Sequence, residues 1–149
     1  MIEACGDERG NDALKKAVRL LSVDGLDGAM MVVEKELESN PVSWEARCAK
    51  ADILYLQGLY GASLQWSEKS LALNPNNALA WNTKGNALYK LGRYKEAIEC
   101  YGKAIEIEPL FIRAWYNKKL AVEIQLKRLR PQVHYLSVKA KRKKHSDER

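Results

Sequence analysis

The side chains that most often carry enzyme chemistry are few in this chain and share no motif. The only two histidines, His134 and His145, lie in a basic segment near the C-terminal end, with no nucleophile or carboxylate at a catalytic spacing. Acidic pairs such as Glu96 and Glu99 have the spacing of a solvated helix face. The chain has no glycine-rich phosphate loop. We therefore predict that it has no catalytic residues and is not an enzyme.

The cysteines do not suggest a metal site or a disulfide framework. Cys5, Cys48 and Cys100 are widely separated, and none belongs to a C-x-x-C pair. A free cysteine usually behaves as a small apolar residue that is buried. We therefore expect free, buried thiols in a reducing compartment, with no metal and no cofactor.

The first twelve residues are acidic and do not resemble a secretory signal, which begins with a basic segment followed by an apolar one. No apolar run approaches the roughly 18–20 residues of a membrane-spanning helix. These features predict a cytoplasmic protein without a membrane span.

The net charge of +6 is concentrated at one end of the sequence. Residues 127–149 hold nine basic and two acidic residues, whereas residues 1–126 hold 16 basic and 17 acidic ones. The densest part, which we call the basic tail, consists of Lys139, Lys141, Arg142, Lys143 and Lys144. It could neutralise the phosphates of nucleic acid or an anionic surface. Alternatively, it is a solvated helix end, where basic residues suit the helix dipole.

A fixed interval organises the rest of the chain. Pro41, Pro75 and Pro109 are equally spaced, which is typical of a repeat of about 34 residues. Small residues, large aliphatic residues and turn formers keep the same phase; they include Ala17, Ala51 and Gly85, Leu20, Leu54, Leu88 and Val122, and Asp24, Gly58 and Gly92. Several chemical classes with one phase indicate stacked supersecondary units.

The clearest unit runs from residue 78 to residue 111 and has the pattern of two amphipathic helices. Trp81, Gly85, Leu88 and Leu91 follow helical spacing and predict the buried stripe of the first helix. Gly92 is expected to end that helix by adopting a left-handed conformation. The second stripe consists of Ala97, Ile98, Tyr101, Ala104 and Ile105. Small residues let the two helices approach closely, and an aromatic ring fills the space beside them.

The third unit carries two runs of signature residues, Trp81-x3-Gly85-x2-Leu88 and Ala97-x3-Tyr101-x2-Ala104-x4-Pro109. These runs resemble the tetratricopeptide repeat. The resemblance extends over residues 10–130, with units at 10–43, 44–77 and 78–111 and a capping helix at 112–128. It implies an all-α fold, a right-handed superhelical stack of antiparallel helix pairs with seven or eight helices.

Three positions depart from the family pattern. Arg47 occupies the usual position of a tryptophan, Glu36 a usually small position, and Lys119 the position of Ala or Gly. The pattern fades at both ends, as expected of capping units with polar outer faces.

At the ends of the chain, we expect residues 1–9 to be flexible. Pro131 is expected to break a continuous helix, so that residues 131–149 form a separate short helix and the basic tail. Val133, Leu136 and Ala140 would dock this helix onto the stack.

The resemblance also implies where a ligand would bind. In this family the first helix of each unit lines a concave groove that commonly receives a peptide. The matching residues of this chain are Asp52, Tyr55, Asn82, Asn86, Tyr89, Arg113, Tyr116 and Asn117. Asn86 and Asn117 occupy sites where chaperone-binding relatives use asparagines to hold a peptide backbone. A carboxamide suits this role because it both donates and accepts hydrogen bonds.

Those relatives also use basic residues to clamp a C-terminal carboxylate. Here the matching sites hold Cys48, Asp52, Asn82 and Asn86, and only Arg113 supplies a cation. This composition disfavours recognition of an acidic chaperone tail.

Together these features predict a non-enzymatic interaction module or scaffold that binds a peptide segment of another protein in its groove. The alternative is binding of nucleic acid or an anionic surface by the basic tail. Self-association through the apolar ends of the stack is left open.

Overall fold

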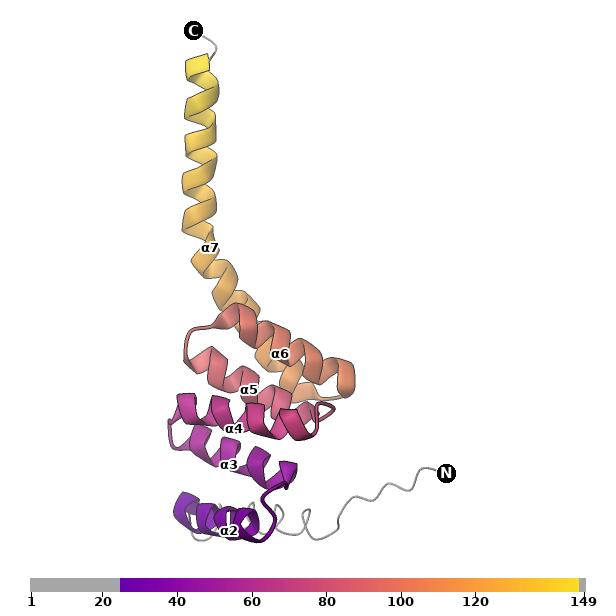
Figure 1. Cartoon of the computed structure of the whole chain (residues 1–149). Coiled ribbons are helices and arrows are strands. Elements are labelled where there is room, and N and C mark those ends of the chain that lie inside the picture. Colours follow the sequence, from indigo (N-terminus) through magenta and orange to yellow (C-terminus); the bar gives the residue numbers. More distant parts are fainter. Residues whose placement is uncertain (1–24, 148–149) are drawn as a thin grey trace.

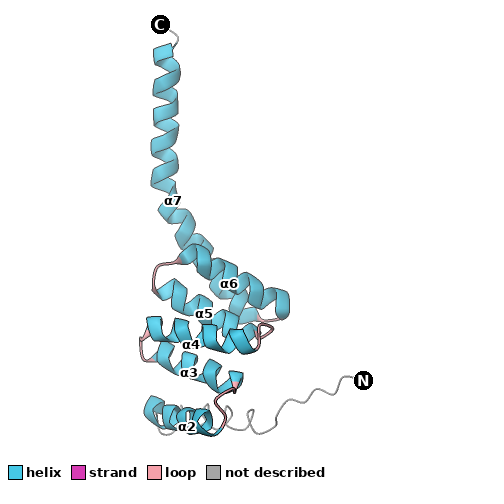
Figure 2. Cartoon of the chain, in the orientation of Figure 1, coloured by secondary structure: helices cyan, strands magenta, loops and turns pink. Residues whose placement is uncertain are grey.

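The structure is a computed structural model that describes residues 25–147, with side chains for all of these except 134, 136–138 and 140–147. Between Gly25 and Asp147 the chain is entirely helical, without a strand (Figure 2). The six helices are α2 Gly25–Ser39, α3 Trp44–Leu56, α4 Tyr60–Leu73, α5 Ala78–Lys90, α6 Tyr94–Ile107 and α7 Ile112–Asp147. The predicted all-α helical repeat fold is confirmed.

The helices stack in chain order, each beside its neighbours along the chain (Figure 1). Helices α3 and α4 form one antiparallel hairpin and α5 and α6 the next, within the predicted units 44–77 and 78–111. Helix α2 takes the place of the second helix of unit 10–43. The expected first helix of that unit lies outside the described residues, as do residues 1–9 and Cys5. This difference, together with the course of α7, explains why six helices are described rather than seven or eight.

Local signals that recur from one unit to the next set the helix ends. Ser43 and Asn77 cap α3 and α5. The side chain of each accepts a hydrogen bond from the backbone N–H group three residues later, at 3.1 and 3.2 Å respectively. Gly58 and Gly92 follow the ends of the same two helices with φ of 79° and 77°. That left-handed conformation favours glycine, so these residues turn the chain into the second helix of each unit.

A long side chain near the start of each first helix donates a hydrogen bond to the carbonyl oxygen of a proline six residues earlier. The pairs are Arg47 Nη2 with Pro41, Trp81 Nε1 with Pro75 and Trp115 Nε1 with Pro109, at 2.7, 2.8 and 2.9 Å. The arginine that departs from the family pattern therefore makes the same contact as the two tryptophans.

A close helix–helix contact lies between α5 and α6. The ring of Tyr101 lies directly over Gly85, and a Cβ atom added to Gly85 would lie 2.6 Å from Tyr101 Cε1. Tyr101 is fully buried beside Leu88 and Ala97. Only glycine leaves room for the ring at this point, which confirms the expectation that a small residue permits close packing.

Leu91, which the sequence pattern assigns to the interior, is exposed at the C-cap of α5. Trp115, one repeat after the predicted core residue Trp81, is 53 % exposed. Leu91 is exposed because the helix ends there. Helix α6 covers one side of α5, but no described helix covers the corresponding side of α7. Trp115 lies on that side and is therefore exposed. Trp81, at the matching position in α5, is partly buried.

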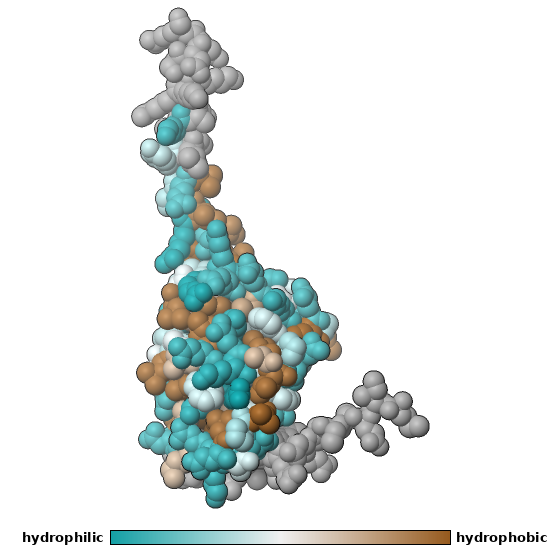
Figure 3. Space-filling view, in the orientation of Figure 1, coloured by the Kyte–Doolittle hydropathy of each residue, from teal (hydrophilic) through white to brown (hydrophobic). Residues whose placement is uncertain are grey.

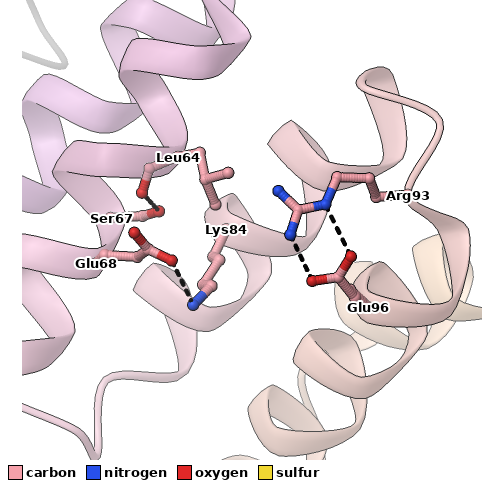
Figure 4. Close-up of polar contacts among 6 residues, drawn as sticks. All are labelled: Leu64, Ser67, Glu68, Lys84, Arg93 and Glu96. Atoms are coloured by element: carbon pink, nitrogen blue, oxygen red, sulfur yellow. Dashed lines mark hydrogen bonds and ion pairs between the residues drawn. The ribbon is translucent and has the colours of Figure 1, made fainter.

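An ion pair joins successive units at positions related by the repeat. Lys50 Nζ lies 2.9 Å from Glu34 Oε1, and Lys84 Nζ lies 2.9 Å from Glu68 Oε1. Figure 4 shows the second pair beside the hydrogen-bonded pair of Arg93 and Glu96 at the start of α6. The next lysine in phase is Lys118, but the acidic position opposite it is Gly102. No described carboxylate forms an ion pair with Lys118.

Helix α7 continues through Pro131, so the expected break and separate helix at this point are wrong. Proline removes one hydrogen bond, to the carbonyl of Lys127, and that region of the helix is exposed, so water can solvate the free carbonyl. Val133 is exposed and does not dock onto the stack. Arg128 contacts the stack, with its guanidinium carbon 4.7 Å from the ring centroid of Tyr94. Beyond it α7 projects away from the stack (Figure 1).

The Gly85 contact predicts opposite effects for the same substitution at two helical glycines. Gly85→Ala is expected to lower the free energy of unfolding by about 1–3 kcal/mol, because the added methyl group collides with a buried ring. Gly61→Ala in α4 meets no atom within 4 Å, and should raise it by about 0.5 kcal/mol through helix propensity. Urea unfolding of both variants measures these changes. Stabilisation by Gly85→Ala would contradict the contact.

The missing acidic residue opposite Lys118 predicts a stabilising substitution. Gly102→Glu should raise the free energy of unfolding by about 0.5 kcal/mol through helix propensity and by a few tenths more through a new ion pair. Gly102→Gln supplies the matched control, because it has similar propensity but no charge. Urea unfolding at low and high salt separates the two effects. Equal stability of the Glu and Gln variants at low salt would show that the third pair does not form.

Candidate functional site

All eight residues predicted to line a ligand groove come from the first helices α3, α5 and α7. These three helices contact one another in order. We call the surface that these three helices form together the first-helix surface. It carries the eight predicted residues, which are Asp52, Tyr55, Asn82, Asn86, Tyr89, Arg113, Tyr116 and Asn117. The repeat places these residues together although they span 66 positions of sequence.

Three asparagines form a hydrogen-bonded cluster between α5 and α7. The Nδ2 atom of Asn117 donates to Oδ1 of Asn82 at 3.1 Å and to Oδ1 of Asn86 at 3.0 Å. The hydroxyl group of Tyr101, which lies on α6, donates a hydrogen bond to Asn86 Oδ1 at 2.9 Å. Asn82 is only 1 % exposed, so it orients Asn117 and has no surface for a ligand.

The cluster leaves one donor and one acceptor unused on its exposed side. Asn117 Nδ2 spends both hydrogens on Asn82 and Asn86, and Asn86 Oδ1 accepts twice. Among the described residues, none bonds to Asn86 Nδ2 or to Asn117 Oδ1. Both side chains are partly exposed, so these two atoms can reach a ligand.

Asp52 on α3 is tied to α5 instead of being free for a ligand. It accepts a hydrogen bond from the hydroxyl of Thr83, which is itself buried. Burial raises the pKa of the Asp52 carboxyl from 3.8 to about 6, although the Thr83 hydrogen bond and the charge of Arg113 act in the opposite direction. The Asp52 carboxylate therefore balances the positive charge of Arg113 only above about pH 6.

The aromatic residues of the surface differ in accessibility. Tyr55 and Tyr89 pack against the first tyrosine of the following helix, with ring centroids 5.5 Å from Tyr60 and 5.2 Å from Tyr94 respectively. Tyr116 is exposed, as is Arg113 beside it on α7. Tyr116 is therefore the most accessible aromatic group of the first-helix surface.

Sequence reasoning missed Thr83 and the hydroxyl of Tyr101, which hold Asp52 and Asn86 in place. The signal for Thr83 was present as a spacing. Asp52 and Thr83 are 31 residues apart, as are Asn86 and Asn117, and both pairs bond between successive first helices. No comparable signal identifies the Tyr101 hydroxyl, because the ring alone satisfies the packing pattern.

The two described thiols show no site. Cys48 and Cys100 are buried and free, and burial raises the pKa of the Cys100 thiol to about 11. Among the described residues no group of three potential ligands could hold a metal ion. None of the described helices is both long and apolar enough to cross a membrane. Of the basic tail, only the side chain of Lys139 is described, and it is exposed.

The sequence matches two family profiles, described as tetratricopeptide repeat over residues 78–110 and TPR repeat over residues 51–92. No curated protein sequence matches the chain significantly.

Solved structures with the same fold include the first TPR domain of Spaghetti (RPAP3), bound to the HSP90 peptide SRMEEVD. It is 17 % identical with a TM-score of 0.72, over 80 % of this chain and 94 % of that one. The Sgt2 TPR domain from Aspergillus fumigatus is also 17 % identical, with a TM-score of 0.75 over 82 % of each chain. MamA is 25 % identical, with a TM-score of 0.68 over 89 % of this chain and 81 % of MamA.

The raised pKa of Asp52 predicts a pH-dependent stability. The folded state binds the proton more tightly than the unfolded state, so this contribution is complete below about pH 4 and is lost as pH rises through about 6. Asp52→Asn should therefore gain about 2 kcal/mol over the wild type between pH 4 and pH 7. Urea unfolding at several pH values measures the difference.

Asp27→Asn on α2 is the matched control, because Asp27 is exposed. Its stability should follow that of the wild type across the same range. Parallel curves for Asp52→Asn and the wild type would show that Asp52 is not desolvated.

Proposed function

The chain belongs to the tetratricopeptide repeat family, and we propose that it is a non-enzymatic interaction module that holds an extended segment of a partner protein on its first-helix surface. The observation that carries the proposal is the unused donor of Asn86 and the unused acceptor of Asn117. A peptide unit offers one acceptor and one donor, so it can pair with both atoms whatever its side chains are.

Preorganisation supports the role of these two carboxamides. Each is fixed by hydrogen bonds that use its other polar atom. Asn86 Oδ1 accepts one from Tyr101, and Asn117 Nδ2 donates one to Asn82. A ligand therefore does not have to order them, which lowers the entropic cost of binding.

Side-chain contacts would come from α7 and α5. Tyr116 and Tyr89 offer aromatic surface, the kind of residue that most often anchors an interface. Arg113 adds a cation near Asp52, whose carboxyl becomes protonated below about pH 6. We expect the bound segment to place an apolar or aromatic side chain against Tyr116.

The ligand of one structural neighbour is acidic at its C-terminal end, since the peptide bound by Spaghetti (RPAP3) ends in Glu-Glu-Val-Asp. The first-helix surface of this chain presents Asp52, an acid, and Arg113 as its only cation among the predicted ligand residues. We therefore propose recognition through the peptide backbone and an apolar anchor, without a clamp for a terminal carboxylate.

The alternative function is binding of nucleic acid or an anionic surface by the basic tail. It draws support from the course of α7, whose C-terminal part projects away from the stack (Figure 1). Deleting residues 139–149 leaves the first-helix surface intact, and so separates the two functions.

The proposal predicts that Asn86→Asp weakens partner binding while the fold is preserved. The substitution keeps the Oδ1 acceptor for Tyr101 and Asn117, but replaces the free donor with an acceptor that repels a peptide carbonyl. Affinity for a partner isolated with the full-length protein should fall about tenfold, as measured by titration calorimetry. An unchanged affinity would contradict the proposed contact.

A thermal unfolding curve provides the control for this variant, and it should stay close to that of the wild type. Replacing both Asn86 and Asn117 with alanine is less informative, because it also deprives the buried Tyr101 hydroxyl of its acceptor.

A further inference from the structure

The outer side of α7 differs from the same side of α5, one repeat earlier. In α5, Ala78, Gly85 and Leu88 are buried because α6 packs over them. The positions one repeat later are Ile112, Lys119 and Val122. Ala78 is 7 % exposed, whereas Ile112 is 81 % exposed. The described chain thus provides the first helix of a fourth unit but no second helix to cover it.

Apolar side chains that are exposed or half-buried continue along α7 beyond the stack. Together with Lys119, they recur at alternating intervals of three and four residues, which places them on one side of a helix. We call this row the α7 stripe; it consists of Ile112, Trp115, Val122, Leu126, Leu129 and Val133. Brown side chains lie along one side of α7 where it leaves the stack in Figure 3. The row is about 32 Å long at the rise of an α-helix, enough for a partner helix of five or six turns.

Positive charge predominates around the α7 stripe. Helix α7 contains eleven basic and two acidic residues, whereas residues 1–111 contain 13 basic and 16 acidic ones. Lys119 interrupts the stripe itself, between Trp115 and Val122. Lys118 beside it has no acidic partner among the described residues. An occupant of this surface must therefore be apolar on one side and acidic at its flanks.

We propose that the α7 stripe is a second interaction site, which binds an acidic amphipathic helix of a partner protein in the place that α6 occupies on α5. The two helices would pack through residues spaced three and four apart, as paired helices generally do. Acidic flanks of the partner would pair with Lys118, Lys119 and Arg130. This site lies apart from the first-helix surface and does not depend on Asn86 or Asn117.

Other occupants fit the same observations less well. A second copy of α7 would bring two strongly basic helices together, which is destabilising. Nucleic acid would satisfy the charge, but it offers little to a row of aliphatic side chains along a helix. An anionic membrane would satisfy both, yet the stripe begins at the position where this fold packs a helix.

The full-length protein can be tested with a labelled synthetic peptide of about 21 residues, with leucine at heptad positions a and d and glutamate at e and g. Fluorescence anisotropy measures its affinity for the wild type, Val133→Glu and Tyr135→Glu. Val133 is 62 % and Tyr135 66 % exposed, but only Val133 belongs to the stripe. Both variants add the same charge at an exposed site of the projecting helix, so neither should disturb the stack.

We expect micromolar binding that Val133→Glu weakens by about tenfold and Tyr135→Glu by less than about threefold. A scrambled peptide of the same composition should not bind. Asn86→Asp should bind the peptide like the wild type, which keeps this result independent of the proposed function.

Three results would each overturn the proposal. They are an equal loss of affinity in the two glutamate variants, equal binding of the scrambled peptide, and no binding at about 100 µM peptide. Two further measurements identify the other occupants. Dimerisation in sedimentation velocity that Val133→Glu abolishes would assign the stripe to a second copy. Binding to phosphatidylserine vesicles that Val133→Glu abolishes, without peptide binding, would assign it to a membrane surface.

Discussion

The close approach of two helices at a single glycine is the contact on which the arrangement of the molecule depends. Because Gly85 has no side chain, the ring of Tyr101 can lie against the backbone of α5. The ring fills the interior of the hairpin, and its hydroxyl donates a hydrogen bond to Asn86, the residue after Gly85 in α5. The same tyrosine therefore belongs to the core and to the candidate site, so packing within one hairpin fixes the orientation of a carboxamide on the surface.

Most of the fold could be predicted because each unit repeats the same helix ends and the same close packing of its two helices. Glycine after the first helix, a capping side chain at its start and a small residue at the crossing recur in phase from unit to unit, and each has a local cause. The exceptions are positions where a different residue makes an equivalent contact, or where a neighbour is missing. Arg47 reaches the proline carbonyl that a tryptophan reaches elsewhere. Trp115 belongs to the apolar pattern but is exposed, since a pattern indicates which side can be buried and not whether a helix covers it.

The candidate site was predictable in its location but not in its chemistry. The repeat phase places the asparagines and tyrosines on the first helices, and the structure brings three asparagines together there. Which atoms remain for a ligand depends on hydrogen bonds between helices, and these follow from side-chain directions that the spacing alone does not give. Such bonds tie Asn82 and Asp52 to neighbouring helices, whereas Asn86 and Asn117 each keep one polar atom free for a ligand. The course of α7 through Pro131 was equally unpredictable, because proline disfavours a helix without forbidding one where the freed carbonyl faces water.

The central claim is that the first-helix surface binds a protein segment, and photo-crosslinking from that surface tests it most directly. Benzoylphenylalanine in place of the exposed Tyr116 would be irradiated in the source lysate after nuclease treatment, with the same group at position 135 as the control. The account predicts protein adducts specific to position 116, mapped by mass spectrometry to one extended segment of a partner. Protein adducts that are absent at position 116, or that are the same at both positions, would contradict it.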